Sequence, residues 1–268
     1  MDRLRLKNCI ILILVLMDLF LLFSLFSREG SRHSAQHSAA EQLAQLFASD
    51  GIELDPGIIS NQAPPTGYTL SRSDEWEQRA AATLLGGDFS RSDQGGGIST
   101  YSSNRGAAMF RSTGVFDAAG TLALNGVKFA QEFCETFGYT EPVFQLNEAN
   151  TGSAVVTRVY DEYPVFNSTI TFSLSNGILT GVSGTLLPDT ASETHSDVQP
   201  LSASAALTAF QKYRRETQAV VSSISDIYLC YELQSSASIP MALSPSWCIA
   251  TDTALYYVNC ILGTVTSP

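Results

Sequence analysis

The stretch VFNSTITFSLSNGILTGVSGTLL, residues 165–187, indicates the fold most directly. Its first apolar residues largely alternate with polar ones: Phe166, Ile170, Phe172 and Leu174. This alternation is typical of a β-strand with one buried face. The sequence Ser-Asn-Gly at 175–177 favours a tight turn, and residues 178–187 again have strand character. The stretch therefore predicts an antiparallel hairpin.

The residues before this hairpin predict a helix and two further strands. Asn125 is a suitable helix N-cap, and apolar residues recur at helical spacing from there to Gly138, a typical helix terminator. Residues 142–146 and 154–160 have strand character. A helix is therefore expected to lead into an antiparallel meander.

The same order returns towards the C-terminus. A polar linker, residues 188–200, precedes a helix that opens at Ser202 and ends in a basic turn. Strand-like stretches follow at 225–233, 247–250 and 254–262. We therefore expect an α+β fold with two repeated helix-plus-antiparallel-sheet units.

Residues 39–123 have a less regular pattern. They contain a helical stretch at 39–49 and a second helix from Ser73 to about Leu85. The glycines at 94–97 predict a flexible break. Residues 98–103 and 107–116 are expected to pair as a hairpin.

A long apolar run, CIILILVLMDLFLLFSLF, occupies residues 9–26. As a helix it would extend about 27 Å, close to the thickness of the bilayer's hydrocarbon core. Arg3, Arg5 and Lys7 precede it, which favours a cytoplasmic N-terminus. The alternative is a cleaved signal peptide, but the run is long and lacks a small-x-small site after it. We expect an uncleaved single-pass anchor in the cell membrane and an extracytoplasmic C-terminal part.

These patterns divide the chain into seven expected segments. They are a cytoplasmic N-terminus (1–7), the transmembrane anchor (8–27), a stalk (28–38), an N-terminal extracytoplasmic part (39–123), the first helix-meander unit (124–187), the linker (188–200) and the second helix-meander unit (201–268).

Composition and motifs exclude several classes of function. The formal net charge is −11, so the chain lacks the basic character that nucleic-acid binding requires. It contains no GxSxG, HExxH, P-loop or GxGxxG motif, and no Cys/His spacing typical of zinc sites. Its three histidines do not adjoin a candidate nucleophile: His33, His37 and His195. The sequence therefore contains no recognisable catalytic constellation and no spacing typical of a zinc site.

Four of the five cysteines follow the expected anchor: Cys134, Cys230, Cys248 and Cys260. Cys230 and Cys248 flank a turn centred near residue 239, so they could oppose each other across two antiparallel strands. That position would bring their Cβ atoms to about 4.5–5.5 Å, near the range for a disulfide. A disulfide and two small apolar residues in a sheet are both open interpretations.

Short motifs along the whole chain resemble the YycI proteins and their YycH relatives. The N-terminal stretch KNCIILILVLMDLFLLFSLF, residues 7–26, resembles their membrane anchor. The stretch YDEYPVFN, residues 160–167, resembles a strand turn of that family. PSWCI at 245–249 and YYVNCILG at 256–263 resemble its C-terminal strands, which also look like PepSY-type modules.

The resemblance implies a single-pass membrane protein of Gram-positive bacteria with a PepSY-like extracytoplasmic fold. Such a protein would contact the sensor histidine kinase WalK, also called YycG, and tune the WalKR two-component pathway without catalysis or cofactor. It leaves open whether a YycH-like partner is needed. Two other classes remain: a PepSY-like extracellular binding or protease-inhibitor module, and a cell-wall hydrolase of unrecognised type.

Two sets of residues are candidates for partner contacts. Asp18 interrupts the apolar run, and a carboxylate at that depth favours a partner or protonation, although a tolerated single carboxylate is the alternative. Ser24 lies near the same helical face and could add a hydrogen bond. The second set lies in the strands that carry the resemblance: Tyr163, Pro164, Phe166, Trp247 and Tyr257. These five are either core residues or an exposed partner surface.

Overall fold

The first of three helix-and-meander units occupies the middle of the chain. The computed structural model describes residues 39–194, 198–236 and 239–267. The unit consists of helix α2 (Asp74–Leu85) and strands β3 (Ser90–Gly95), β4 (Ile98–Ser103), β5 (Gly106–Arg111) and β6 (Val115–Ala123). The Ser73 hydroxyl caps α2 by accepting a hydrogen bond from Trp76 N, as its sequence predicts.

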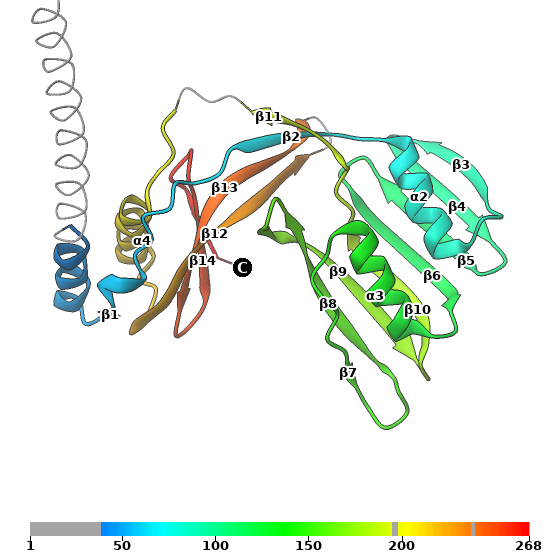
Figure 1. Ribbon diagram of the computed structural model, residues 1–268, viewed down its shortest axis with the longest axis horizontal. Helices are drawn as coiled ribbons and strands as arrows, with labels where there is room; N and C mark the ends of the chain where they lie inside the picture. Colours follow the sequence, from blue (N-terminus) through cyan, green and yellow to red (C-terminus); the bar gives the residue numbers. More distant parts are fainter. Residues whose placement is uncertain (1–38, 195–197, 237–238, 268) are drawn as a thin grey trace, which may run out of the picture.

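The second unit follows directly and continues the same sheet. It consists of helix α3 (Gly126–Phe137) and strands β7 (Gln145–Leu146), β8 (Gly152–Tyr160), β9 (Tyr163–Ser175) and β10 (Ile178–Thr185). Strand β10 pairs antiparallel with both β9 and β6. Helices α2 and α3 cover one face of this joint sheet (Figure 1), where Trp76 and Phe137 meet edge to face at 5.0 Å between ring centroids.

The third unit draws on both ends of the described chain. It consists of helix α4 (Ala203–Thr217) and strands β12 (Ser223–Ser236), β13 (Ile239–Thr251), β14 (Leu255–Asn259) and β15 (Val265–Thr266). The helix over 39–49, strand β1 (Glu53–Leu54) and a 3₁₀ turn (Pro56–Ile58) lie beside it (Figure 1). Phe47 stacks on Phe210 of α4 within one shared core. Asp50 accepts hydrogen bonds from Arg214 and Arg215, which lower the pKa of its carboxyl group.

Two connecting strands lie between these units. Strand β2 (Gly67–Ser71) pairs with β13 and with β11 (Thr190–Thr194). The main path of the sheet is therefore β11-β2-β13-β12-β9-β10-β6-β5-β4-β3. This mixed, mostly antiparallel arrangement confirms the expected α+β class.

Strands β6 and β10 lie on either side of the division expected at residue 124, and they are neighbours in one sheet and share one core. The helix-meander order occurs three times rather than twice. Strand β3 escaped prediction because all six of its residues are exposed and none is apolar. The glycine-rich break is a tight turn between β3 and β4, in which Gly95, Gly96 and Gly97 all have positive φ. The expected linker contains β11.

A cluster of four tyrosines joins the third unit to the second unit and to β2. Tyr231 is fully buried, and the ring centroids of Tyr68, Tyr160 and Tyr163 lie 6.1, 6.2 and 5.9 Å from its own. Beside this cluster, β12 and β9 share the parallel residue pair Tyr231 and Val165. The Asn167 side chain donates to Leu233 O at 2.8 Å and accepts from Leu233 N at 2.7 Å. Aromatic packing and these two hydrogen bonds therefore hold β9 against β12.

Replacing Tyr231 should show how much this cluster contributes to stability. Tyr231→Ala should lower the free energy of unfolding by about 3–5 kcal/mol, because it removes a large buried ring. Tyr231→Phe should cost about 1 kcal/mol, the value of one hydrogen bond. Urea unfolding followed by tryptophan fluorescence measures both. Tyr228→Ala, on the exposed side of the same strand, is the control; an equal loss from it would contradict a special role for Tyr231.

Candidate binding groove

A groove of about 690 Å³ opens on the sheet of the third unit. Along its outer edge, β13 pairs with β2 through residues 241–243 and then with β14 through residues 246–250. Pro245 lies between the two pairings and has no N–H to offer a neighbouring strand. The groove lies around this break, between residues 64–66, 198–200 and 261–262. Its size is within the range of about 300–1,000 Å³ typical of ligand sites.

The first wall, residues 64–66, is fixed from inside the protein. The buried Tyr231 hydroxyl donates a hydrogen bond to Thr66 O at 2.8 Å. Pro64 and Pro65 precede this bond, and their rings restrict the backbone. The tyrosine cluster therefore also positions one side of the groove.

The second wall, residues 198–200, ends at a similar attachment. The fully buried Trp247 donates from Nε1 to Leu201 O at 2.8 Å. Leu201 N donates in turn to Cys260 O at 2.8 Å, beyond the end of β14. These two bonds fix the chain immediately after Pro200 to the sheet.

The third wall, residues 261–262, is shaped by Asn259. Its Oδ1 accepts hydrogen bonds from Ile261 N and Leu262 N, both at 3.0 Å. Its Nδ2 donates to Glu232 Oε2 at 2.8 Å. This polar network presents Leu262 with 66% of its surface exposed.

The floor of the groove is polar. Side chains from β11, β2, β12 and β13 line it: Thr194, Thr69, Gln234 and Ser244. The hydroxyl oxygens of Thr69 and Thr194 are 3.1 Å apart. Glu193 also lines the groove, whereas its described lining includes no lysine, arginine or histidine. Apolar walls above hydrogen-bonding groups suit a partly apolar ligand such as a peptide segment.

Sequence patterns did not single out this groove. It combines segments that are far apart in the chain, and Asn259 is recognisable as important only once its three hydrogen bonds are seen. The sequence predicted a loop at Pro64 and Pro65, a linker ending at Pro200 and a strand beginning at Pro245, and it did not indicate that these prolines share a site. Trp247 was singled out, and the structure makes it a buried residue that positions a wall.

The five expected partner-surface residues do not form one patch. Trp247 belongs to the core beneath α4, whereas Tyr257 is buried on the opposite face of the same sheet. Phe166 is partly buried and stacks on Tyr257 with ring centroids 3.6 Å apart. Tyr163 and Pro164 are partly buried at the tyrosine cluster and its hairpin. Strand alternation separates the five, so an exposed surface made of all of them is wrong.

The expected opposition of Cys230 and Cys248 is also wrong. The register pairs Cys230 with Ser246 and Cys248 with Tyr228. The pairing of the two strands therefore differs by two residues from the one that would place Cys230 opposite Cys248. Both thiols are free and buried. Burial raises the pKa of both, most strongly for Cys230. The structure therefore favours the small, apolar role for these cysteines.

Other expected features are outside the described residues. Asp18, Ser24 and the apolar run at 9–26 lie there, so the structure does not test the expected anchor. Across the described ranges, no helix has the length and apolar character needed to span a membrane. The same ranges contain no group of three or more Cys, His, Asp or Glu side chains arranged to hold a metal ion.

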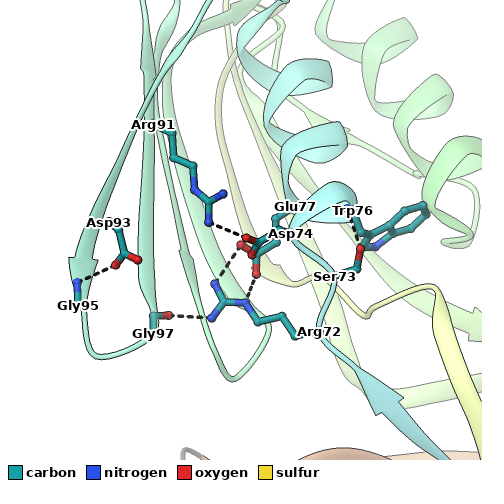
Figure 2. Close-up of polar contacts among 9 residues, drawn as sticks. All are labelled: Arg72, Ser73, Asp74, Trp76, Glu77, Arg91, Asp93, Gly95 and Gly97. Carbon is teal, nitrogen blue, oxygen red and sulfur yellow. Dashed lines mark hydrogen bonds and ion pairs between the residues drawn. The ribbon is translucent and has the colours of Figure 1, made fainter.

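A second polar network lies at the start of α2 (Figure 2). Arg72 Nη2 donates to Glu77 Oε2 at 3.0 Å, and its Nε reaches the other carboxylate oxygen. Arg72 Nη1 also donates to Gly97 O at 3.3 Å. Arg91 binds Asp74 at 3.2 Å. These contacts fasten the first turn of α2 to the β3–β4 hairpin, and we assign the network a structural role.

Of the comparisons with known proteins, only the comparison with solved structures finds proteins similar to this chain. No protein-family model matches the sequence, and no curated protein does so. The chain is similar to an uncharacterised protein from Eubacterium rectale, with 11% identity and a TM-score of 0.40 over 76% of this chain and 81% of that one.

Two further solved structures are similar at comparable levels. The Bacillus megaterium YpeB C-terminal domain has 14% identity and a TM-score of 0.36, over 74% of this chain and 98% of that chain. YycH from Bacillus subtilis has 13% identity and a TM-score of 0.37, over 78% of this chain and 55% of that chain. The proposals below therefore rest on the sequence and on the geometry of this chain.

Removing Arg72 should destabilise the protein by leaving a buried carboxylate unpaired. The Glu77 side chain is only 9% exposed, so Arg72→Met should cost about 3 kcal/mol. The double variant Arg72→Met/Glu77→Leu should recover most of that loss. Urea unfolding measures both, with Arg111→Met in the exposed Arg111–Asp117 pair as a control expected to cost under about 1 kcal/mol. No recovery in the double variant would contradict this explanation.

The four described cysteines should react only after unfolding. Burial raises the pKa of Cys134 and of Cys260 to about 12. At a pH of about 8.5, where half of an ordinary exposed thiol is ionised, these two cysteines therefore form almost no thiolate. Iodoacetamide at that pH should label these positions slowly in the native protein and fully in urea. Peptide mass spectrometry without reducing agent reads out each position. A linked pair of peptides containing Cys230 and Cys248 would contradict the structure.

Proposed function

We propose that this chain is a membrane-anchored, non-enzymatic regulatory protein whose extracytoplasmic part binds and modulates a sensor histidine kinase of the WalK type. The observation that carries the binding role is the preformed groove, in which polar contacts hold Leu262 exposed beside rigid prolines. Because the hydrogen bonds to Asn259 already fix the wall that carries Leu262, a partner that binds there would lose little free energy to ordering it.

The membrane location is supported by the N-terminal sequence. Residues 9–26 are long and apolar enough to span a bilayer, and three cations precede them. In this proposal the anchor helix contacts the membrane helices of the kinase. The motifs at 7–26, 160–167, 245–249 and 256–263 that resemble the YycI and YycH family support the choice of kinase. A YycH-like protein is a further proposed partner.

The groove also favours a second candidate, a PepSY-like extracellular binding or protease-inhibitor module. A groove with apolar walls and a hydrogen-bonding floor could hold a segment of a protease as well as one of a kinase. The two candidates differ in what co-purifies with the chain from membranes. A sensor kinase supports the first, and an extracellular protease without the kinase supports the second.

Asp18 gives the regulatory proposal a direct test. A carboxylate within an apolar span is costly unless it is hydrogen-bonded to a partner. An interhelical hydrogen bond contributes about 0.6–2 kcal/mol to the association of the helices. Asp18→Leu should therefore weaken co-purification with the kinase by about threefold to thirtyfold and shift the output of a kinase-dependent reporter. Ser24→Ala should have a smaller effect in the same direction.

The control for this experiment is Leu16→Ile, which keeps the apolar character of the run. Insertion of all variants is checked by protease treatment of intact cells, which should remove the C-terminal part and leave a short membrane fragment. If Asp18→Leu binds and regulates as well as the original chain, Asp18 is a tolerated carboxylate. If no kinase co-purifies with the original chain, the kinase proposal itself fails.

A further inference from the structure

We propose that strand β3 pairs with the β3 strand of a second copy of this chain, so that two sheets join at their edges. This interaction goes beyond the proposed function and does not depend on a kinase. Strand β3 ends the main path of the sheet (Figure 1), and among the described strands it pairs with β4 alone. Its outer side therefore presents backbone N–H and C=O groups that a further strand can bind.

The network at the start of α2 holds this edge strand in place (Figure 2). Arg72 Nη1 donates to Gly97 O in the β3–β4 turn, and Arg91 of β3 binds Asp74 of α2. The helix itself packs against β4, β5 and β6, and all six residues of β3 remain exposed. A second copy would therefore meet an ordered, uncovered strand, which lowers the free-energy cost of binding.

Symmetry restricts how two β3 strands can pair. Opposite residues of an antiparallel ladder point to the same face of the sheet, and a twofold axis makes the two strands equivalent. The central residue of the ladder must therefore lie opposite its own copy. The β3–β4 ladder is regular from Ser90 to Asp93, after which its register shifts. Within this stretch, a ladder with pairs on both sides of the axis can be centred on Arg91, Ser92 or Asp93.

Charge selects Ser92 as the centre. A ladder centred on Arg91 or on Asp93 would bring two like charges opposite each other, which is unfavourable. A ladder centred on Ser92 instead places Arg91 of each copy opposite Asp93 of the other. Ser90 then faces Gln94, whose side chain can hydrogen-bond its hydroxyl. Charges on an edge strand usually oppose pairing, but these two opposite charges make the edge complementary to itself.

Both charged side chains can bind this additional partner. Arg91 Nη2 donates to Asp74 Oδ2 at 3.2 Å, and a guanidinium has further N–H donors. Asp93 Oδ1 accepts from Gly95 N at 2.8 Å, and a carboxylate accepts several hydrogen bonds. Each Arg91 can therefore bind Asp74 of its own chain and Asp93 of the second copy together.

Disulfide trapping in the purified full-length chain tests the register, and it suits the weak association that so short a ladder implies. In the proposed ladder the two Ser92 residues have Cβ atoms about 4.5–5.5 Å apart, near the range for a disulfide. Under a mild oxidant, Ser92→Cys should give a linked dimer as its main product. The matched control is Ser90→Cys, which is also exposed on β3 but would lie about 13 Å from its own copy along the strand. The unsubstituted chain controls for links through its five cysteines.

Charge reversal in the Ser92→Cys chain tests the ion pairs. Arg91→Glu and Asp93→Arg should each slow the linking by about tenfold, because two attractive pairs become two repulsive ones. A mixture of these two variants, carrying tags of different size, should link rapidly into a heterodimer, since opposite charges again face each other. Loss of the Arg91–Asp74 contact cannot explain such a recovery, because the mixture does not restore it. Far-ultraviolet circular dichroism checks that all variants are folded.

Three results would overturn the inference. The first is equal linking of Ser90→Cys and Ser92→Cys, which would indicate random collision. The second is the absence of a linked Ser92→Cys dimer, and the third is a mixture that links no faster than either charge variant alone. The kinase has no part in these measurements, so the proposed function succeeds or fails by its own test.

Discussion

The burial of Tyr231 is the constraint on which most of the structure depends. Its ring is the centre of the cluster that joins β12 to the β8–β9 hairpin and to β2. Its buried hydroxyl needs a hydrogen-bond partner, which Thr66 O supplies. One side chain therefore connects the packing of two units and sets the first wall of the groove. The hydrogen bonds between Asn167 and Leu233 reinforce the same connection where the β12–β9 ladder has only one residue pair.

The other two walls follow the same design, in which a buried polar group of the sheet fixes an irregular segment. The ring of Trp247 packs in the apolar core, and its Nε1 donates a hydrogen bond to Leu201 O. Asn259 ends β14 and turns the chain so that Leu262 faces solvent. The groove is thus a product of core residues, and its shape depends on the folding of the third unit as a whole.

Local patterns predicted the elements whose stability is local. Ser73, Asn125 and Ser202 cap their helices as expected, and the turn at 175–177 joins β9 to β10. The sequence did not predict β3 or β11, since their exposed, polar residues are held by neighbouring strands and not by a buried face. The cysteine register failed for a different reason: Ser236 pairs with Ile239, so β12 and β13 turn earlier than the centre near residue 239 that the sequence indicated, and alternation alone cannot locate the turn. The groove depends on contacts between residues more than 100 positions apart, which no local pattern contains.

The third unit is closed by both ends of the described chain, because Leu43, Phe47 and Ile52 share a core with Phe210, Trp247 and Val258. This has a consequence for synthesis. A ribosome makes the helix at 39–49 long before β14, while the first two units have all their partners available in between. The helix must therefore wait, with its apolar face uncovered, until about 200 further residues have been added and its core is complete. Shortening the chain at its C-terminus would thus strip the packing from its N-terminal helix, and a protease or chaperone acting during translation would meet that helix before its core exists.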